Sequence, residues 1–161
     1  MTLQIRPFTV ADMSAIVQLS LLAWEPVFTA WQAILGPDLY PIAIYQDWRK
    51  SQQEAVEKTC QDERNKTWVA EVAGQVIGFI SYTLHEDTQT GEVQMLAVHP
   101  DDQNRGVGTE LNLFALQKMR EGGMKLAVVG TGGDEGHAPA RRSYEKAGYT
   151  GLPLVRYYQA L

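Results

Sequence analysis

Two glycines, Gly106 and Gly108, stand where a strand-like segment meets an amphipathic helix, and this junction is suited to hold a phosphate. The segment 92–99 is β-branched and apolar, and Pro100 ends it. From Thr109 onward, apolar residues recur at the three-to-four residue spacing of a helix. The first turn of a helix has unpaired backbone N–H groups and a partial positive charge, which favour an anion. Glycines, which lack a Cβ, let that anion approach closely.

Two familiar phosphate loops do not fit these residues. A Walker loop needs Gly-Lys-Ser/Thr, and a dinucleotide fingerprint needs a third glycine where Leu111 stands. The second glycine-rich stretch, 130–136, lacks the Walker lysine and has Glu135 at the third-glycine position. The glycines alone therefore predict an anion site without identifying the anion.

Composition predicts one cytoplasmic domain. The 161 residues are 45% hydrophobic, and no linker divides them, so we expect a single domain over 1–161. A net charge of −5 gives no footprint for nucleic acid. The lone Cys60 forms no internal disulfide, and polar residues interrupt the apolar stretch 15–35, so we expect no membrane span.

Periodicity and turn signals predict ten elements. In order, these are a strand at 3–7, a helix from 9 towards 26, a helix from 41 that carries Tyr45 and Trp48, strands at 68–73, 76–84 and 92–99, a helix from 109, a strand at 125–129, a helix at 139–147 and a strand near 155–159. This order indicates a mixed α/β (α+β) fold with a largely antiparallel sheet.

The junction resembles motif A of the GCN5-related N-acetyltransferases, whose signature is Gln/Arg-x-x-Gly-x-Gly/Ala after a strand that ends in Val-x-Pro. Here the chain reads Val98-His99-Pro100 and then Gln103-Asn104-Arg105-Gly106-Val107-Gly108. Ile5-Arg6-Pro7 with Asp12 resembles the family's opening, and Arg142 to Tyr149 resembles its Tyr-Glu-Lys-x-Gly-Phe end. The resemblance covers nearly the whole chain and implies the acyl-CoA N-acyltransferase fold.

The resemblance also implies acetyl-CoA as the co-substrate, held in a gap where the sheet splays. The backbone of Leu96 and Val98 would bind the pantetheine arm, and 103–108 would bind the pyrophosphate. The cofactor-binding residues that it implies are Leu96, Val98, Gln103, Asn104, Arg105, Gly106, Val107, Gly108, Thr109, His137 and Tyr144.

His137 departs from the family, which often has an asparagine at that place. Its ring could make the same hydrogen bond, serve as a second base, or open the helix beside Pro139, and we rank the structural role first. The loop 130–136 before it is rich in glycine. That composition suits a close approach to a ligand, a mobile lid or an ordinary flexible loop.

Acetyl transfer to an amine needs a proton acceptor, since an amine with a pKa of about 10.4 is almost entirely protonated near neutral pH. Glu92 matches the place where several family members carry a glutamate base. Strand alternation would put Glu92, Leu96 and Val98 on one face. The alternative role for Glu92 is a solvated carboxylate at the end of the strand.

A proton donor is needed where the CoA thiolate leaves. Tyr144 matches the family's general acid, and a phenol is protonated at neutral pH. The alternative is a core tyrosine on a short helix. His85, His99 and Cys60 show no metal-ligand spacing, so we predict no metal.

The residues and the resemblance together predict an acetyl-CoA-dependent N-acetyltransferase that acts directly on a primary amine of a small molecule or peptide. The alternative is a non-catalytic acyl-CoA-binding sensor with the same fold. Aromatic residues crowd the first two expected helices and suit an apolar or cationic acceptor, although core packing explains most of them. We expect no nucleic-acid or membrane partner, and a homodimer is a candidate assembly.

Overall fold

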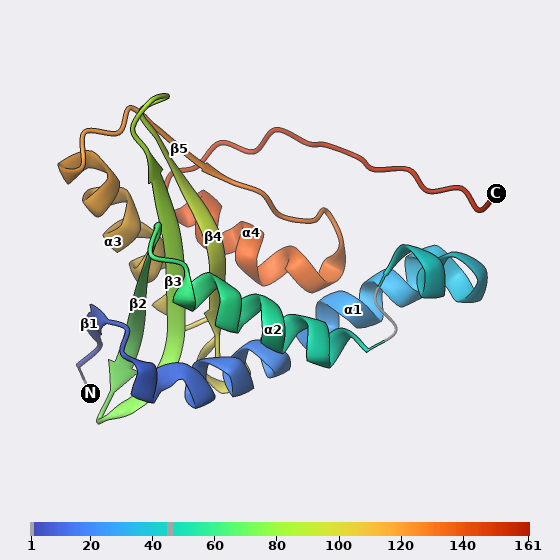
Figure 1. Cartoon of the computed structure of the whole chain (residues 1–161), viewed down its shortest axis with the longest axis horizontal. Coiled ribbons are helices and arrows are strands. Elements are labelled where there is room, and N and C mark those ends of the chain that lie inside the picture. The colour runs from blue at the N-terminus through green and yellow to red at the C-terminus, as the bar shows by residue number, and fades with distance from the viewer. Residues whose placement is uncertain (1, 45–46) are drawn as a thin grey trace.

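A five-stranded sheet forms the centre of the computed structural model, which describes residues 2–44 and 47–161 (Figure 1). The elements are β1 (Gln4–Pro7), η1 (Val10–Asp12), α1 (Met13–Ala43), α2 (Trp48–Gln61), β2 (Asn65–Val72), β3 (Gln75–His85), β4 (Thr90–Val98), η2 (Pro100–Asp102), α3 (Val107–Glu121), β5 (Leu126–Val129), η3 (Glu135–His137) and α4 (Ala138–Lys146).

The strands lie in the order β1-β2-β3-β4-β5. The first four pair antiparallel, and β5 pairs parallel with β4. This confirms the expected mixed α/β fold with a largely antiparallel sheet. The β2–β3 hairpin turns at Ala73 and Gly74, whose φ angles of 50° and 80° give the mirror-image turn that suits the twist of two paired strands.

Two helical layers enclose the sheet (Figure 1). On one face, Ile16 and Leu19 of α1 and Val56 of α2 pack on Val69 and Phe79. On the other face, α3 buries a separate cluster against the sheet, and the cluster includes Ile80, Val93, Val107, Leu111, Ala115 and Met119. α4 packs beside α3 on that second face. Each layer therefore forms because its helices bury one apolar side against the sheet.

The first helix is much longer than predicted. It continues through Pro26 as far as Gly36, whose φ of 73° and ψ of 178° break it, and a second helical piece follows this kink to Ala43. The second helix begins at Trp48 rather than 41, and the Asp47 side chain caps it by accepting from the Lys50 N–H. The prediction for Tyr45 lies outside the described residues.

By length and a mean hydropathy of 1.3, the segment Val10–Ala43 could cross a membrane, although core helices often share these properties. Here one of its faces packs on the sheet, where Ile16, Val17, Leu19, Val27 and Phe28 are buried. The absence of a membrane partner stays a prediction.

β4 carries an irregularity that overturns the expected alternation. Its register against β3 shifts between Ser81, opposite Met95, and Tyr82, opposite Val93, so Gln94 is the extra residue. Val93 and Leu96 therefore pack on the α3 side, whereas Met95 packs on the α1 side. The extra residue reverses the pattern, so Glu92 does not share a face with Leu96 and Val98 as predicted.

β4 and β5 separate after a short ladder. Their pairing runs from Thr90 opposite Leu126 to Val93 opposite Val129. Beyond Val93, the edge of β4 that faced β5 has no strand beside it in the described part of the chain. This is the splay that the resemblance implied.

The strand expected near 155–159 is not formed. Residues 150–161 carry no regular secondary structure, and all of them are exposed. Figure 1 shows this segment leaving the body as an extended arm that runs past the end of α1. Because residues 154–158 pair with no other strand, their backbone groups lack ladder partners, and the apolar pattern alone does not produce a strand.

Candidate active site

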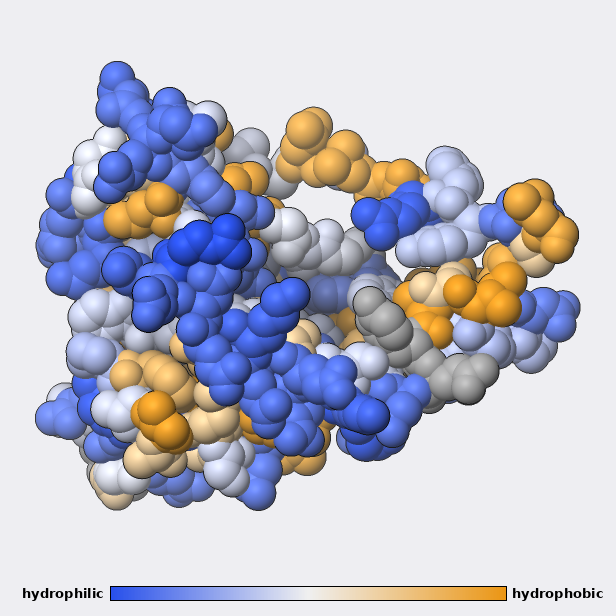
Figure 2. Space-filling view, viewed as in Figure 1, coloured by the Kyte–Doolittle hydropathy of each residue, from blue (hydrophilic) through white to orange (hydrophobic). Residues whose placement is uncertain are grey.

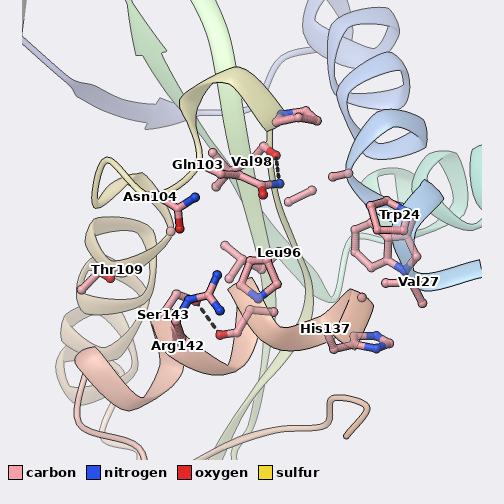
Figure 3. A pocket seen from close by; sticks show the side chains of 18 of the residues that line it. Trp24, Val27, Leu96, Val98, Gln103, Asn104, Thr109, His137, Arg142 and Ser143 are labelled. Carbon is pink, nitrogen blue, oxygen red and sulfur yellow. Dashed lines mark hydrogen bonds between the residues drawn. The ribbon is translucent and has the colours of Figure 1, made fainter. Parts of the chain in front are cut away.

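A cavity of about 210 Å³ lies where the middle of α1, one face of α4, the open edge of β4 and the start of α3 come together (Figure 3). In Figure 3, Trp24 and Val27 of α1 stand on one side, and Asn104 and Thr109 stand on the other. Its lining residues come from Leu22–Val27, Leu96–Val98, Pro100–Thr109, Glu135–Ala140 and Arg142–Lys146. The cavity thus joins segments from the whole length of the chain.

The start of α3 forms one end of the cavity. Gly106 is the N-cap of α3 with a φ of 88°, and no side chain caps the helix there. Gly106 has open space where a Cβ would lie, whereas a Cβ on Gly108 would come within 3.3 Å of Ser143 Cβ. The first N–H groups of α3 are therefore uncovered beside the cavity, as an anion site requires.

Two cations line the cavity near this helix start. Arg142 and Lys146 lie one turn apart on α4, and Ser143 lies on the same face of that helix. Two positive side chains and a helix N-terminus favour a ligand group with more than one negative charge. A diphosphate has this property, so the described residues fit the pyrophosphate of CoA.

The middle of the cavity follows the open edge of β4. Leu96 and Val98 line it with apolar side chains (Figure 3). Gln103 does not point its amide at the helix start, because Gln103 Nε2 donates to the Val98 carbonyl at 3.0 Å. Gln103 therefore fixes the loop 99–106 against the end of β4.

At the other end, α1 offers a backbone acceptor. Pro26 lies inside the helix and has no N–H, so the carbonyl of Leu22, four residues earlier, lacks its usual helical donor. Both residues line the cavity, as do Trp24 and Val27. This end therefore combines an aromatic wall with a carbonyl that is free to accept a hydrogen bond.

The loop before α4 is fixed to α1 by a polar cluster. Asp134 Oδ1 lies 2.7 Å from His137 Nδ1 and accepts from Trp31 Nε1 at 3.1 Å. Arg141 Nη1 donates to the carbonyls of Gly132 and Asp134, both at 2.6 Å. Burial acts to raise the pKa of Asp134, but its hydrogen bonds from His137 and Trp31 outweigh burial and lower it. The loop is therefore held in place, and Asp134 is a carboxylate.

Gly136 lies against the backbone of α1 in the same contact between the loop 130–137 and α1. A Cβ there would come within 2.5 Å of Val27 Cα and 2.7 Å of the Pro26 carbonyl oxygen. The close approach that the glycine-rich loop predicted is therefore an approach to α1, which seals one side of the cavity.

The structure brings most of the predicted site residues together. Those that line the cavity are Leu96, Val98, Gln103, Asn104, Gly106, Gly108, Thr109 and His137. Arg105, Val107, Glu92 and Tyr144 are absent from the described lining. Arg105 instead pairs with Asp102 at 3.0 Å, and Val107 is buried in the core under α3.

Glu92 lies apart from the cavity. Its Oε2 is 2.9 Å from His85 Nε2, and both side chains are nearly half exposed. The neighbouring Gln94 donates to Thr83 Oγ1 on the same face of the sheet. Glu92 therefore belongs to a polar surface near the C-terminal end of α2.

Tyr144 is buried behind the cavity wall formed by its neighbour Ser143. Its ring meets Tyr149 edge to face, with 5.8 Å between the ring centroids. Burial raises the pKa of the Tyr144 phenol well above its usual value. The phenol is therefore protonated near neutral pH.

The sequence reading missed several residues of the site. Pro139, Arg142, Ser143 and Lys146 follow a three-to-four residue spacing, which places them on one face of α4 and was a readable signal. Asn112 gave no such signal. It is fully buried, and its Nδ2 donates to the Gly108 carbonyl and to Ser143 Oγ, which ties α3 to α4.

No group of three or more histidine, cysteine, aspartate or glutamate side chains is arranged to hold a metal ion in residues 2–44 and 47–161.

Comparison with known proteins agrees with this geometry. The profile described as "Acetyltransferase (GNAT) family" matches residues 26–149. A mycothiol acetyltransferase of Thermomonospora curvata is 34% identical over 93 residues, which cover 58% of this chain and 30% of the relative. One of Saccharomonospora viridis is 30% identical over 118 residues, which cover 64% and 38%. The chain thus spans about a third of the length of these curated relatives.

Solved structures share the fold. The PaiA N-acetyltransferase of Thermoplasma acidophilum, in complex with coenzyme A, superposes with a TM-score of 0.69 at 16% identity and covers 93% of this chain and 91% of its own. A GNAT acetyltransferase of Brucella melitensis, in complex with acetyl-CoA, gives 0.64 at 22% identity, with 93% and 84% covered. The profile match, which covers most of the chain, and the shared fold confirm the predicted relationship: this chain belongs to the acetyltransferase (GNAT) family, a family of acetyl-CoA-dependent N-acetyltransferases.

Proposed function

We propose that this chain transfers the acetyl group of acetyl-CoA directly to a primary amine of a small molecule or peptide. The observation that carries this proposal is the continuity of one cavity. It runs from the uncovered start of α3, along the open edge of β4, to Trp24 in the middle of α1. A donor and an acceptor can therefore meet in it without leaving the protein.

The polarity of the cavity supports one orientation of acetyl-CoA. Arg142, Lys146 and the α3 N-terminus collect positive charge at one end. Leu96 and Val98 offer an apolar surface and open strand edge beyond it. The phosphates would occupy the charged end and the pantetheine arm the strand edge, so that the acetyl group points towards α1. When bound, acetyl-CoA supplies an activated thioester carbonyl.

The acceptor amine is expected at the α1 end. Trp24 offers an aromatic face that attracts a cation, and the free Leu22 carbonyl can accept a hydrogen bond from an ammonium or amine N–H. Glu135 lines the same cavity and adds a negative side chain. These three groups favour a cationic amine over a neutral alcohol.

The proton acceptor that fits this end best is His137. Its side chain lines the cavity, and Asp134 holds Nδ1, which leaves Nε2 available to a proton. The Asp134 carboxylate would also stabilise the imidazolium. In Figure 3 the ring lies beside α1 near Val27, and its centroid is 5.7 Å from that of the Trp31 ring. We therefore rank His137 ahead of Glu92, which pairs with His85 outside the cavity.

Tyr144 remains our choice of proton donor to the departing thiolate. Burial raises the pKa of the Tyr144 phenol, so the hydroxyl is protonated near neutral pH and can donate a hydrogen bond to the negative charge that develops on the sulfur. Covalent catalysis through Cys60 is disfavoured, because burial raises the pKa of this thiol to about 11 and keeps it from forming a thiolate near neutral pH. Direct transfer of the acetyl group from acetyl-CoA to the amine needs no such thiolate.

A thiol-release assay tests the proposed function. The chain is incubated with acetyl-CoA and a panel of amines, aminoglycosides, polyamines, amino acids and peptide N-termini. Because the curated relatives are mycothiol acetyltransferases, mycothiol-related amines belong in the panel. We expect amine-dependent release of CoA thiol with at least one class. Stabilisation by acetyl-CoA in a melting assay, without release for any amine, would instead support the acyl-CoA sensor.

A further inference from the structure

Trp31 of α1 contacts the loop 130–137 next to His137, yet it is absent from the described lining of the cavity. Its indole Nε1 donates to Asp134 Oδ1 at 3.1 Å, across 103 positions of sequence. Its ring also lies against the His137 ring, with 5.7 Å between the centroids and 37° between the planes. Trp31 therefore touches both the proposed base and the carboxylate that holds it, without lining the space where a ligand would bind.

Asp134 is a buried carboxylate, and both of its oxygens accept hydrogen bonds. The side chain is 5% exposed. Oδ1 lies 2.7 Å from His137 Nδ1 and also accepts from the indole, whereas Oδ2 accepts from the backbone N–H of His137 at 3.2 Å. Loss of the indole N–H would leave a lone pair of a buried charge without a donor, which is costly. The carboxylate would then turn or take up water, and the His137 ring would lose its fixed acceptor.

The same hydrogen bonds determine which nitrogen of His137 carries the proton. Burial acts to raise the pKa of Asp134, but hydrogen bonds from His137 and Trp31 lower it, so the group is ionised near neutral pH and can only accept. Nδ1 of His137 must therefore carry the ring proton. The lone pair of Nε2 is then free to take a proton from an amine.

Aromatic packing holds the indole of Trp31 in this orientation. Trp31 meets Phe28 edge to face, with 5.3 Å between the ring centroids. Figure 2 shows a hydrophilic outer face on α2, whereas Trp48 of that helix stacks on Phe28 with 4.5 Å between the ring centroids. Side chains of two helices therefore fix the direction of the indole N–H.

We propose that Trp31 is a positioning residue for the base: its indole N–H orients the Asp134 carboxylate, which keeps His137 in the Nδ1–H tautomer. The inference rests on the proposed function for the role of His137, and it adds the group on α1 that sets the state of that ring. Figure 3 shows the His137 side chain beside α1, as this contact requires.

A pair of variants tests the role of the indole N–H in turnover. Trp31→Phe removes the N–H and keeps an aromatic ring. With an amine that the chain acetylates, we expect kcat to fall about tenfold and KM for acetyl-CoA to stay within about twofold. In a His137→Gln background the same change should cause no further loss, because the group that Trp31 positions is already gone. An equal loss in both backgrounds would make Trp31 a packing residue and overturn the inference.

Trp68→Phe is the matched control for these kinetics. Trp68 also meets a phenylalanine edge to face, with 4.6 Å to the ring of Phe114, and it is absent from the described lining of the cavity. This variant should keep the kcat of the parent chain.

The other two histidines of the chain provide internal references for the tautomer. His99 Nδ1 accepts from the backbone N–H of Asp101 at 3.3 Å, so its ring proton lies on Nε2. His85 Nε2 lies 2.9 Å from Glu92 Oε2, and a carboxylate only accepts, so its proton also lies on Nε2. His137 is therefore the one histidine expected as the Nδ1–H tautomer.

Nitrogen NMR of the histidine rings tests the positioning without turnover. At a pH at which the rings are neutral, the parent chain should show one Nδ1–H ring, and its signal should disappear in His137→Gln. Trp31→Phe should raise the share of Nε2–H in His137 and leave His85 and His99 unchanged. An Nε2–H ring at His137 in the parent, or an unchanged His137 tautomer in Trp31→Phe, would overturn the inference. If no amine is acetylated, the proposed function fails, and the NMR result still decides whether Trp31 orients His137.

Discussion

Tyr144 and Tyr149 are two buried phenols in edge-to-face contact, yet only one is proposed to donate a proton. Burial raises the pKa of both side chains. The Tyr149 hydroxyl is buried without a hydrogen-bond partner in the described residues. The two side chains therefore offer a matched pair for separating chemistry from packing.

Tyr144→Phe should lower kcat by about 100-fold, since a positioned proton donor contributes on that order. The melting temperature should hardly change, because no hydrogen bond to the phenol is lost in the described contacts. Tyr149→Phe should leave kcat unchanged and keep or raise stability, because it removes an unsatisfied buried hydroxyl. Equal activity in the two variants would make Tyr144 a core residue.

His137 and Glu92 compete for the role of proton acceptor. His137→Gln should lower kcat/KM at least tenfold, whereas Glu92→Gln should stay within threefold of the parent chain. Glutamine can still donate to Asp134, so the loop should keep its position. The measurement is kcat/KM as a function of pH for both variants. The opposite ranking would restore Glu92 as the base.

At the scale of elements, the site depends on how the loop 130–137 meets α1. Gly136 touches the backbone of Pro26 and Val27, and the cluster of Asp134, His137 and Trp31 lies next to this contact. One wall of the cavity is therefore held by a contact between backbones, with no room for a side chain.

Gly136→Ala should lower the free energy of unfolding by about 1–3 kcal/mol, because an overpacked contact with backbone atoms has to shift. It should also raise KM for the amine, since the α1 end of the cavity opens. Gly133→Ala is the matched control in the same loop, where a Cβ meets nothing within 4 Å. Chemical denaturation and steady-state kinetics measure both effects. If Gly133→Ala lost as much stability and raised KM as much as Gly136→Ala, the contact between Gly136 and α1 would not be the cause of these effects.

The junction of β1 and α1 gives a prediction on pH. Arg6 bonds Asp12 at 2.8 Å, and this contact lowers the pKa of Asp12 from 3.8 to about 2 against the opposing effect of burial. A lowered folded-state pKa contributes stability that is present above pH 4 and is lost as the pH falls towards 2. We expect a loss of about 1–2 kcal/mol over that range after solvent screening of the partly exposed Arg6.

Asp12→Asn should remove this part of the pH dependence, and unfolding measured between pH 2 and pH 6 would show it. Asp62→Asn is the control: a hydrogen bond from Arg64 also lowers the pKa of Asp62 to about 2, but solvent screens this exposed pair, so the variant should keep most of the parent's slope. The account of the junction fails if Asp12→Asn keeps the parent's slope.

Turns and helix starts that depend on neighbouring residues could be predicted from the sequence. Gly74 fixed the hairpin turn, and the glycines before 109 placed the start of α3. The extra residue at Gln94 depends on how β4 pairs with β3, which no local pattern encodes. The sequence therefore predicted Glu92 on the same face as Leu96, whereas the structure places it on the opposite face. The contact between Trp31 and Asp134 joins residues that lie far apart in sequence, so it too could not be read from spacing.

On the scale of the whole molecule, helices cover both faces of a splayed sheet, the candidate active site lies beside the open edge of β4, and residues 150–161 leave the body as an extended arm. The motif around Gly106 predicted one end of that cavity, while the opposite end, where we propose that the amine binds, is lined by Trp24 and Val27 of α1, and no local pattern predicted that these residues face the cavity. The strand expected near 155–159 did not form, because residues 150–161 pair with no strand of the sheet. Both differences come from tertiary context.

The central claim is that the start of α3 binds the phosphates of acetyl-CoA, and the affinity of a Thr109→Glu variant tests it most directly. Thr109 lines the cavity in the first turn of α3, where a glutamate stabilises a helix but repels a phosphate. Gln117→Glu adds the same charge near the other end of this helix. By calorimetry, we predict that Thr109→Glu weakens acetyl-CoA binding at least 100-fold with no loss in melting temperature, while Gln117→Glu binds like the parent. Unchanged affinity in the Thr109→Glu variant would contradict the account.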